Sequence, residues 1–333
     1  MTTASGVHNG ATSARRAAML KSAFGPVIGA ALADPDVLEI LANPDGSLWI
    51  ERAGEGRKRE AQPIRPADAE RIIRLVASGA GFDCDAARPI VSAELPETGE
   101  RFEGVLHPVS TAPAFAIRKP AVRVLSLDEY VESGVMTATQ AFILRAAIAA
   151  KNNILIAGGA SSGKTTLVNA LLAEIAQLCE RIVILEDTRE LQCAADDRIA
   201  LRTSESADLQ SLVRATMRLR PDRIIVGEVR GGEALDLLKV WNTGHPGGVA
   251  TIHANSAAAA LSRLEQLIGE RTANVPRQLI ADAVDVVVFI AKTPNGRAVR
   301  EIIRISGLNP DQSYRIASAQ GPELSLVIQG DLS

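Results

Sequence analysis

The chain has 333 residues, of which 47% are hydrophobic and 23% charged, so it can form two domains with separate cores, and wholesale disorder is excluded. Its formal net charge of −3 argues against a protein whose main task is to coat nucleic acid, and no sequence-specific nucleic-acid binding is expected. The cysteines, Cys84, Cys179 and Cys193, lie far apart without C-x-x-C spacing, so the sequence indicates neither a disulfide framework nor a cysteine zinc site and favours a reducing, cytoplasmic setting.

The chain opens with a Ser/Thr/Gly-rich stretch, residues 1–13, that is expected to be a disordered tail. The following pair, Arg15–Arg16, precedes an apolar run and loosely resembles a twin-arginine export signal; an amphipathic first helix is the favoured alternative. No stretch reaches the ~18 uncharged apolar residues of a spanning helix. The most apolar one, Leu279–Ala291, is interrupted by Asp282 and Asp285. Any membrane contact is therefore expected to be peripheral.

Residues 14–117 predict a small α+β domain. Short apolar runs separated by turn sequences indicate strands, and an apolar stripe at helical spacing indicates a helix. The expected elements are strands at Val37–Ala42 and Ser47–Glu51, a helix at Pro66–Ser78 and short strands within Arg101–Ile117. A linker is expected at residues 118–130, where basic residues, a proline and a helix-capping residue occur together.

Residues 131–333 predict an α/β domain in which almost wholly apolar strands alternate with helices. This alternation is typical of a parallel sheet covered by helices on both faces. Helices are expected at Thr137–Ala150 and Thr165–Leu178, a hairpin at Asn295–Gly296, and strands at Asn153–Ala157, Arg181–Glu186, Arg223–Val226, Gly248–Ile252 and Val284–Ile290.

The sequence Gly158-x-x-x-x-Gly163-Lys164-Thr165 is a P-loop pattern, and it lies between a predicted strand and a predicted helix. Small residues let backbone N–H groups curl around phosphate oxygens at the helix N-terminus. The ammonium group of Lys164 would neutralise the β and γ phosphates of ATP, and the Thr165 hydroxyl would hold Mg²⁺. The expected phosphate-binding residues are Gly158, Gly159, Ala160, Ser161, Ser162, Gly163, Lys164, Thr165 and Thr166.

Acidic residues follow two of the apolar strands. Glu186 and Asp187 end the strand that begins at Arg181, and Glu228 follows the strand that ends at Val226. Because the carboxyl ends of parallel strands line the ligand crevice, these acids are expected to face the P-loop. Glu228 is the candidate for positioning the attacking water. A standard Walker B strand would carry aspartate at the position of Gly227, so Glu186 and Asp187 are expected to support Mg²⁺, mainly through water.

Two histidines, His245 and His253, bracket a glycine turn and a short strand, so both are expected to approach one site. A third ligand at fixed spacing is missing, which disfavours a metal centre. A polar sensor of the nucleotide is the favoured interpretation.

The order of these motifs closely resembles the type II/IV secretion ATPases: a P-loop, a Glu-Asp-Thr-Arg-Glu box, a Gly-Glu strand end and a Thr-Gly-His…Thr-x-His-Ala-Asn box. The resemblance covers nearly the whole chain from about Ala30 to Ser306. It implies a RecA-like P-loop domain, an N-terminal domain that closes over nucleotide, and a homo-hexameric ring. It also implies Glu186 in the Asp box, Glu228 as the Walker B glutamate, and His253 with His245 in the His box.

The resemblance further implies arginines that reach the γ-phosphate. The matching positions are Arg101 and Arg118 in the N-terminal domain and Arg218 before the Walker B strand. Arginine suits this task because it stays charged and offers a planar fork of donors. A surface or ion-pair role is the alternative for each of them.

The branch of the family follows from what the sequence lacks. A four-cysteine zinc module and an Ala-Ile-Arg-Asn-Leu-Ile segment are both missing, which favours conjugation or secretion. The expected function is Mg²⁺-dependent ATP hydrolysis that powers substrate transfer or pilus assembly together with inner-membrane channel components. A pilus or tight-adherence motor of the same fold is one alternative. An ATP-binding scaffold without turnover is another, which Glu228 disfavours.

Overall fold

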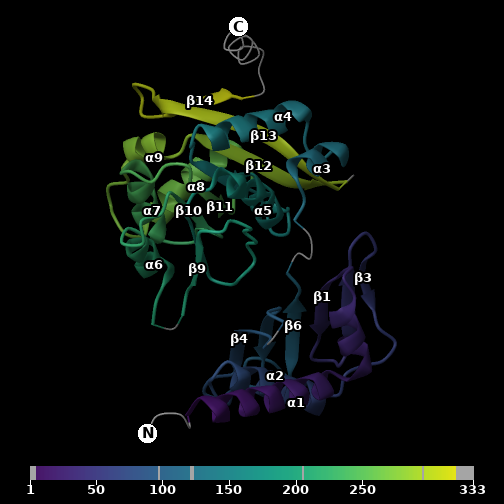
Figure 1. Ribbon diagram of the computed structural model, residues 1–333. Helices are drawn as coiled ribbons and strands as arrows, with labels where there is room; N and C mark the ends of the chain where they lie inside the picture. The colour runs from purple at the N-terminus through teal and green to yellow at the C-terminus, as the bar shows by residue number, and fades with distance from the viewer. Residues whose placement is uncertain (1–4, 97, 121–123, 205, 295, 320–333) are drawn as a thin grey trace. The chain divides into compact units, whose positions relative to one another are not determined.

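The structure, a computed structural model, describes residues 5–96, 98–120, 124–204, 206–294 and 296–319 (Figure 1). It divides into two compact units, Met1–Val122 and Arg123–Ser333. The last strand of the first unit ends at Arg118, and the first helix of the second begins at Leu127, so the predicted linker 118–130 overlaps both.

The first unit is an antiparallel sheet with two helices packed on its core. The strand order is β3-β2-β1-β6-β5-β4. One hydrophobic core joins α1 (Ser5–Ala33), α2 (Pro66–Gly79) and the inner side of the sheet, which confirms the predicted α+β class. The strands are β1 Val37–Ala42, β2 Leu48–Arg52, β3 Gly56–Arg59, β4 Ile90–Glu94, β5 Arg101–Val105 and β6 Ala114–Arg118.

Helix α1 differs from the sequence-based expectation at its start. It begins at Ser5, whereas residues 1–13 were expected to be disordered; residues 1–4 lie outside the described part of the chain. The expectation rested on Ser, Thr and Gly, whose low helix propensity is a weak guide. The helix kinks at Gly25, which has a φ of 65°, because Pro26 lacks the N–H that would continue the ladder.

The second unit is built on a sheet with the strand order β14-β13-β12-β7-β11-β10-β8-β9. All pairs from β12 to β9 are parallel, as predicted, and β13 and β14 add an antiparallel edge, of which the sequence did not predict β14. The predicted hairpin joins β12 to β13, although Asn295 itself lies outside the described residues. The strands are β7 Ile154–Ala157, β8 Ile182–Glu186, β9 Arg198–Arg202, β10 Arg223–Val226, β11 Val249–Ile252, β12 Val286–Thr293, β13 Gly296–Leu308 and β14 Tyr314–Ser318.

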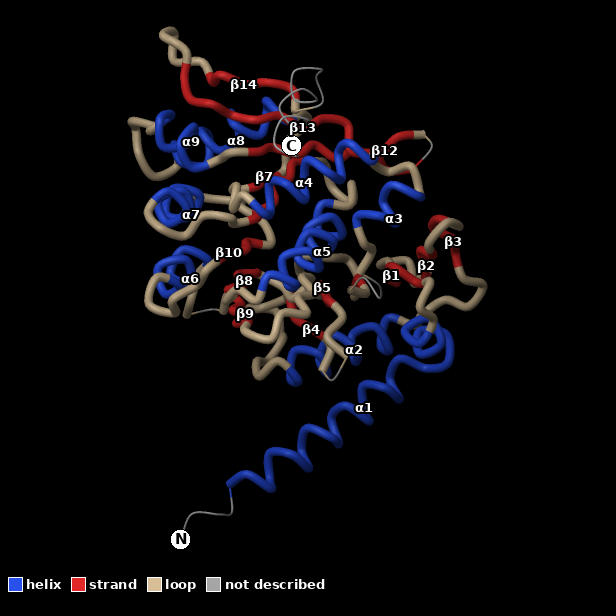
Figure 2. Tube along the Cα trace, turned by 45° about the horizontal axis from the view of Figure 1, so that its top comes forward, coloured by secondary structure: helices blue, strands red, loops and turns tan. Residues whose placement is uncertain are grey.

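Helices cover both faces of this sheet (Figure 2). One face carries α3 Leu127–Glu132, α4 Ala138–Ala149 and α5 Lys164–Ile175, which a short 3-10 turn, Ala176–Leu178, continues. The other face carries α6 Leu209–Thr216, α7 Glu233–Asn242, α8 Ala257–Gly269 and α9 Arg277–Ala283. β7, β10 and β11 are buried at every position, and apart from Arg223 in β10 and Thr251 in β11 their residues are apolar. Among the described residues no helix is long and apolar enough to cross a membrane.

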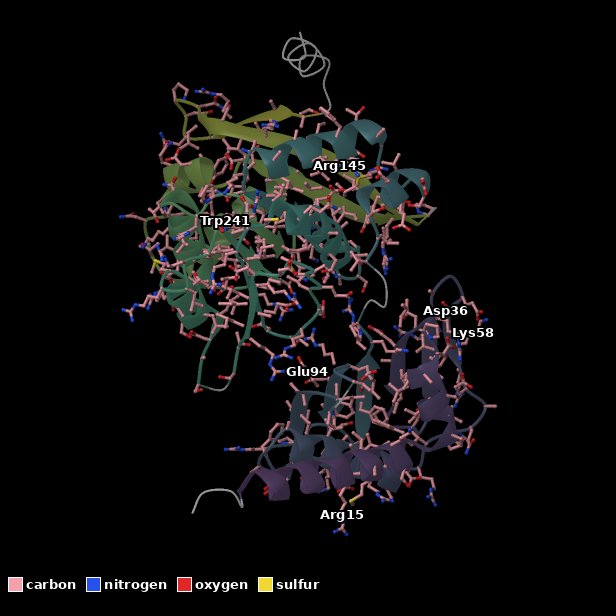
Figure 3. All side chains as sticks on the ribbon, viewed as in Figure 1. Arg15, Asp36, Lys58, Glu94, Arg145 and Trp241 are labelled. Atoms are coloured by element: carbon pink, nitrogen blue, oxygen red, sulfur yellow. The ribbon has the colours of Figure 1, made fainter. Side chains whose placement is uncertain are left out.

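A close approach at Gly248 fixes the start of β11. A Cβ atom there would lie 2.1 Å from Nε1 of Trp241 and 2.7 Å from the carbonyl oxygen of Ile224. Trp241, labelled in Figure 3, is 2% exposed and has no room to move aside. The Trp241 side chain of α7 can therefore pack against the sheet here only over a glycine.

Gly248→Ala is expected to destabilise the second unit by about 1–3 kcal/mol, because overpacking forces a shift of the core. Chemical unfolding followed by circular dichroism measures the effect. Gly269→Ala is the matched control, since its Cβ would make an ordinary 3.8 Å contact with Val275. Equal unfolding midpoints for the two variants would contradict the prediction.

Candidate active site

Four neighbouring strands place the predicted site residues in one row. In the sheet β7, β11, β10 and β8 are adjacent and parallel, so their carboxyl ends share one edge. The P-loop follows β7, His253 follows β11, Glu228 lies just beyond β10, and Glu186 is the last residue of β8. Strands lie ~4.8 Å apart, so each group is within side-chain reach of the next.

The P-loop has the backbone of a phosphate cradle. Gly163 is the N-cap of α5 with a φ of 101°, and Ser161 also has a positive φ, of 55°. A Cβ on Gly158 would lie 2.4 Å from the hydroxyl of Ser162, so only glycine fits. The hydroxyl of Ser162 is buried, and within the described part of the chain it has no hydrogen-bond partner. This orphaned donor, with the α5 N-terminus, suits an anionic group.

Lys164 is buried against the loop that it follows. Its Nζ donates to the carbonyl oxygens of Gly158 and Gly159, both at 3.0 Å, and lies 3.4 Å from Nδ1 of His253. An ammonium group has donors only, so Nδ1 faces it as an acceptor and the proton of a neutral ring is on Nε2. That Nε2 lies 2.6 Å from Oε1 of Glu228. Lys164, His253 and Glu228 are thus in continuous contact.

The other oxygen of Glu228 faces Arg230. Nε of Arg230 donates to Oε2 of Glu228 at 2.8 Å, Nη2 donates to the same atom, and Nη1 lies 3.5 Å from Oδ2 of Asp187. Burial lowers the pKa of Arg230, but the hydrogen bond with Glu228 and the nearby charges of Glu228, Asp187 and Glu190 outweigh it and raise the pKa. The guanidinium group therefore stays charged between these carboxylates.

Glu186 anchors the loop that follows β8. The carboxylate is 4% exposed, and its Oε1 accepts hydrogen bonds from the backbone N–H groups of Glu190 and Leu191, each at 2.8 Å. This folds the loop back so that Oε2 of Glu190 accepts from the Thr165 hydroxyl at 3.2 Å. The carboxylate next to the candidate metal-binding hydroxyl is therefore that of Glu190.

Asp187 has different surroundings. Its Oδ1 accepts from the hydroxyl of Thr203 at 3.1 Å, while Oδ2 faces Arg230. Both oxygens are thus engaged in side-chain contacts beside Glu228. A role of Asp187 in supporting Mg²⁺ through water stays a prediction.

The side chain of Glu186 leaves little room for an aspartate at position 227. A Cβ atom on Gly227 would lie 3.2 Å from Cγ of Glu186. The side chain of Glu186 thus fills the space beside β10 that a residue at position 227 would enter. The glycine and the glutamate on neighbouring strands fit each other.

The expectation that His245 and His253 approach one site is wrong within this chain. His245 precedes β11 and its Nδ1 lies 3.0 Å from the carbonyl oxygen of Pro221, at the amino end of β10. His253 follows β11, and a strand rises ~3.3 Å per residue, so the two rings lie at opposite edges of the sheet. Arg218 is exposed and also precedes the amino end of β10, at the edge opposite its own P-loop.

The two arginines of the first unit are neighbours. Arg101 on β5 is the direct cross-strand partner of Arg118 on β6, so their side chains share one face of the sheet. Glu94 pairs with Arg101 on one side and Glu39 with Arg118 on the other, where Nε of Arg118 lies 4.0 Å from Oε1 of Glu39. Across the strands β1, β6, β5 and β4 these residues form a row in the order acid, arginine, arginine, acid.

Several residues in the second unit contact the site although sequence reasoning did not single them out. Asn169 lies one helical turn after Thr165 and donates to the carbonyl oxygen of Glu190 at 3.3 Å, so its spacing on α5 was a usable signal. Arg230 is close to Glu228 in sequence. Arg297, whose Nε donates to the carbonyl oxygen of Ser161 at 3.4 Å, comes from β13 and had no local signal.

The family model described as "Type II/IV secretion system protein" matches residues 26–305. A probable conjugal transfer protein TrbB of Sinorhizobium fredii (strain NBRC 101917 / NGR234) is 52% identical over 303 residues, covering 90% of this chain and 93% of its own. A conjugal transfer protein TrbB of Rhizobium radiobacter is 52% identical over 290 residues, covering 86% and 90%. The solved pilus retraction motor PilT with bound ADP aligns with a TM-score of 0.60 at 16% identity, covering 94% of this chain and 87% of that one, which shows the fold.

Gly227→Asp is expected to destabilise the second unit by at least about 2 kcal/mol, because it brings a second carboxylate against the buried Glu186. Adding Glu186→Gln should recover part of this loss, since one of the two charges is then removed. Thermal unfolding of the single and double variants measures both effects. A Gly227→Asp variant as stable as the wild type would show that Glu186 does not fill this space.

Proposed function

The chain belongs to the family of type II/IV secretion system proteins, and from this premise we propose that it hydrolyses ATP with Mg²⁺ to power a conjugative type IV secretion machine. The observation that carries the proposal is the contact between Lys164, His253 and Glu228, which joins the phosphate cradle to an acid that can orient water. The two relatives that are 52% identical are named conjugal transfer proteins, which favours this branch over a pilus motor.

Phosphate binding would use the groups at the N-terminus of α5. The hydroxyl of Ser162 and the backbone N–H groups of the loop would donate to phosphate oxygens. Lys164 would exchange the carbonyl oxygens of Gly158 and Gly159 for the β and γ phosphates. When bound, Mg²⁺ would neutralise charge on these phosphates, held by the Thr165 hydroxyl and supported through water by Glu190 and Glu186.

Hydrolysis would depend on Glu228, which would hold the attacking water in line with the γ-phosphate and accept its proton. His253 lies between Lys164 and Glu228, so movement of Lys164 onto a phosphate would change what the ring of His253 contacts. We infer that His253 reports the presence of the γ-phosphate to Glu228.

A single chain leaves the site incomplete. Arg218 lies at the sheet edge opposite its own P-loop, so it would reach the nucleotide of a neighbouring subunit. Arg101 and Arg118 would supply charge from the first unit as it closes over nucleotide. We therefore propose a homo-hexameric ring in the cytoplasm that contacts inner-membrane channel components peripherally.

Purified wild-type protein with ATP and Mg²⁺ is expected to show steady-state phosphate release that Lys164→Ala abolishes. Glu228→Gln should keep ATP binding and lose ~10²–10⁴-fold in kcat, because the amide cannot accept a proton. Tight ATP binding without turnover above the Lys164→Ala background, in any oligomeric state, would support the ATP-binding scaffold instead.

The ring is tested by sedimentation velocity with ATP and Mg²⁺. A species near six times the monomer mass is expected. A second experiment tests Arg218: Arg218→Ala should lower turnover in that assembled species with little effect on ATP binding. In mixed rings, Arg218→Ala subunits should restore activity to Lys164→Ala subunits only if the arginine acts on its neighbour's nucleotide. Persistent monomer at high protein concentration would contradict the proposal.

A further inference from the structure

We propose that Arg230 is a positioning residue that orients the Glu228 carboxylate by tying it to Asp187. The inference rests on the proposed function, because it assigns a supporting residue to the hydrolytic step. It also gives Asp187 a role that acts through Arg230.

The contacts of Glu228 divide between its two oxygens. Oε1 is buried and lies 2.6 Å from Nε2 of His253, but among the described residues it has no hydrogen-bond partner. Oε2 accepts from Nε and Nη2 of Arg230, the former at 2.8 Å. A glutamate side chain has rotatable bonds, and the two N–H donors of one planar guanidinium group on Oε2 restrict the plane of the carboxylate while Oε1 stays free to bind water. That plane decides where a water bound to Glu228 would lie.

Arg230 is itself held in place from two directions. Its backbone N–H donates to Oε1 of Glu233 at 2.7 Å, and the N–H of Gly231 donates to the same oxygen at 2.8 Å, so the start of α7 anchors the main chain. Its Nη1 lies 3.5 Å from Oδ2 of Asp187, whose other oxygen accepts from Thr203. The guanidinium group is thus oriented before any nucleotide arrives.

The exposed fractions of these side chains indicate that Arg230 positions Glu228 and does not stabilise the fold. The side chain of Arg230 is 52% exposed and that of Asp187 is 40% exposed, whereas Glu228 is 16% exposed. Exposed ion pairs add little to stability, so losing Arg230 should leave the fold intact. The effect of the loss should then fall on the geometry of the more buried Glu228.

Arg230 also lies away from the phosphate cradle. Its side chain contacts Glu228 and Asp187, which follow β10 and β8, and its backbone N–H contacts Glu233 on α7. The groups that would bind phosphate follow β7, two strands away. Removal of Arg230 should therefore lower kcat while KM for ATP stays nearly unchanged.

The experiment compares steady-state kinetics of Arg230→Gln, Arg230→Lys, Asp187→Asn and the Arg230→Gln/Asp187→Asn double variant. Arg230→Gln is expected to lose ~10–100-fold in kcat, since misplaced catalytic groups cost about that much. KM should change less than ~2-fold, and Arg230→Lys, which keeps the charge but not the fork of donors, should recover part of the loss. The double variant should resemble Arg230→Gln alone, because Asp187 acts through Arg230.

Arg214→Gln is the matched control, since Arg214 is similarly exposed, at 56%, and pairs with Asp236 on α7 away from the site. It should keep wild-type kcat and KM. The inference is overturned if Arg230→Gln keeps its kcat, if its KM rises as much as its kcat falls, or if the losses of Arg230→Gln and Asp187→Asn simply add. Loss of turnover in the wild type would instead remove the proposed function, so the two failures are distinct.

Discussion

Parallel strands lie ~4.8 Å apart, and this spacing sets what each group at the carboxyl edge of the sheet can touch. The P-loop strand β7 and the strand β10 that leads to Glu228 are not neighbours, because β11 lies between them. Lys164 and Glu228 therefore need an intermediate group, and His253 at the end of β11 has the length and the two ring nitrogens to contact both. The order of the strands thus accounts for a histidine at that position.

The same spacing explains the pairing of Gly227 with Glu186. These residues end neighbouring parallel strands, where a side chain at position 227 would lie 3.2 Å from Cγ of Glu186. The carboxylate of Glu186 accepts hydrogen bonds from the backbone N–H groups of Glu190 and Leu191. These hydrogen bonds hold the side chain of Glu190 against the Thr165 hydroxyl. Where a standard Walker B strand carries an acid this chain has Gly227, and the carboxylate beside the P-loop hydroxyl is that of Glu190, in the loop that Glu186 holds.

The sequence predicted the central sheet well because burial on both faces makes the strands runs of apolar residues, as in all of β7 and in Ile224–Val226 of β10. The edge strands were missed for the opposite reason: β14 is largely exposed, and its pairing with β13 is not encoded in a local pattern. The placement of His245 failed although the signal was present. The predicted strand between His245 and His253 already required them to lie at opposite ends.

Residues within a motif were easier to predict than residues that meet through the fold. Lys164 and Thr165 are fixed by local loop geometry, whereas Arg297 reaches Ser161 from a strand more than a hundred positions later in the chain, a separation of 136. The contact of Glu190 with Thr165 depends on how Glu186 folds the intervening loop, which composition does not reveal.

The existing contacts of Lys164 determine how the site would respond to nucleotide. Its ammonium group is satisfied by two carbonyl oxygens and a histidine nitrogen, so binding phosphate must replace interactions that already exist. Such an exchange costs less than ordering a free side chain, because Lys164 is already buried. Movement of Lys164 onto a phosphate would also release Nδ1 of His253, whose Nε2 contacts Glu228 on the side of the P-loop. We infer that binding and orientation of water are coupled through this one ring, while Arg230 keeps the far side of Glu228 fixed.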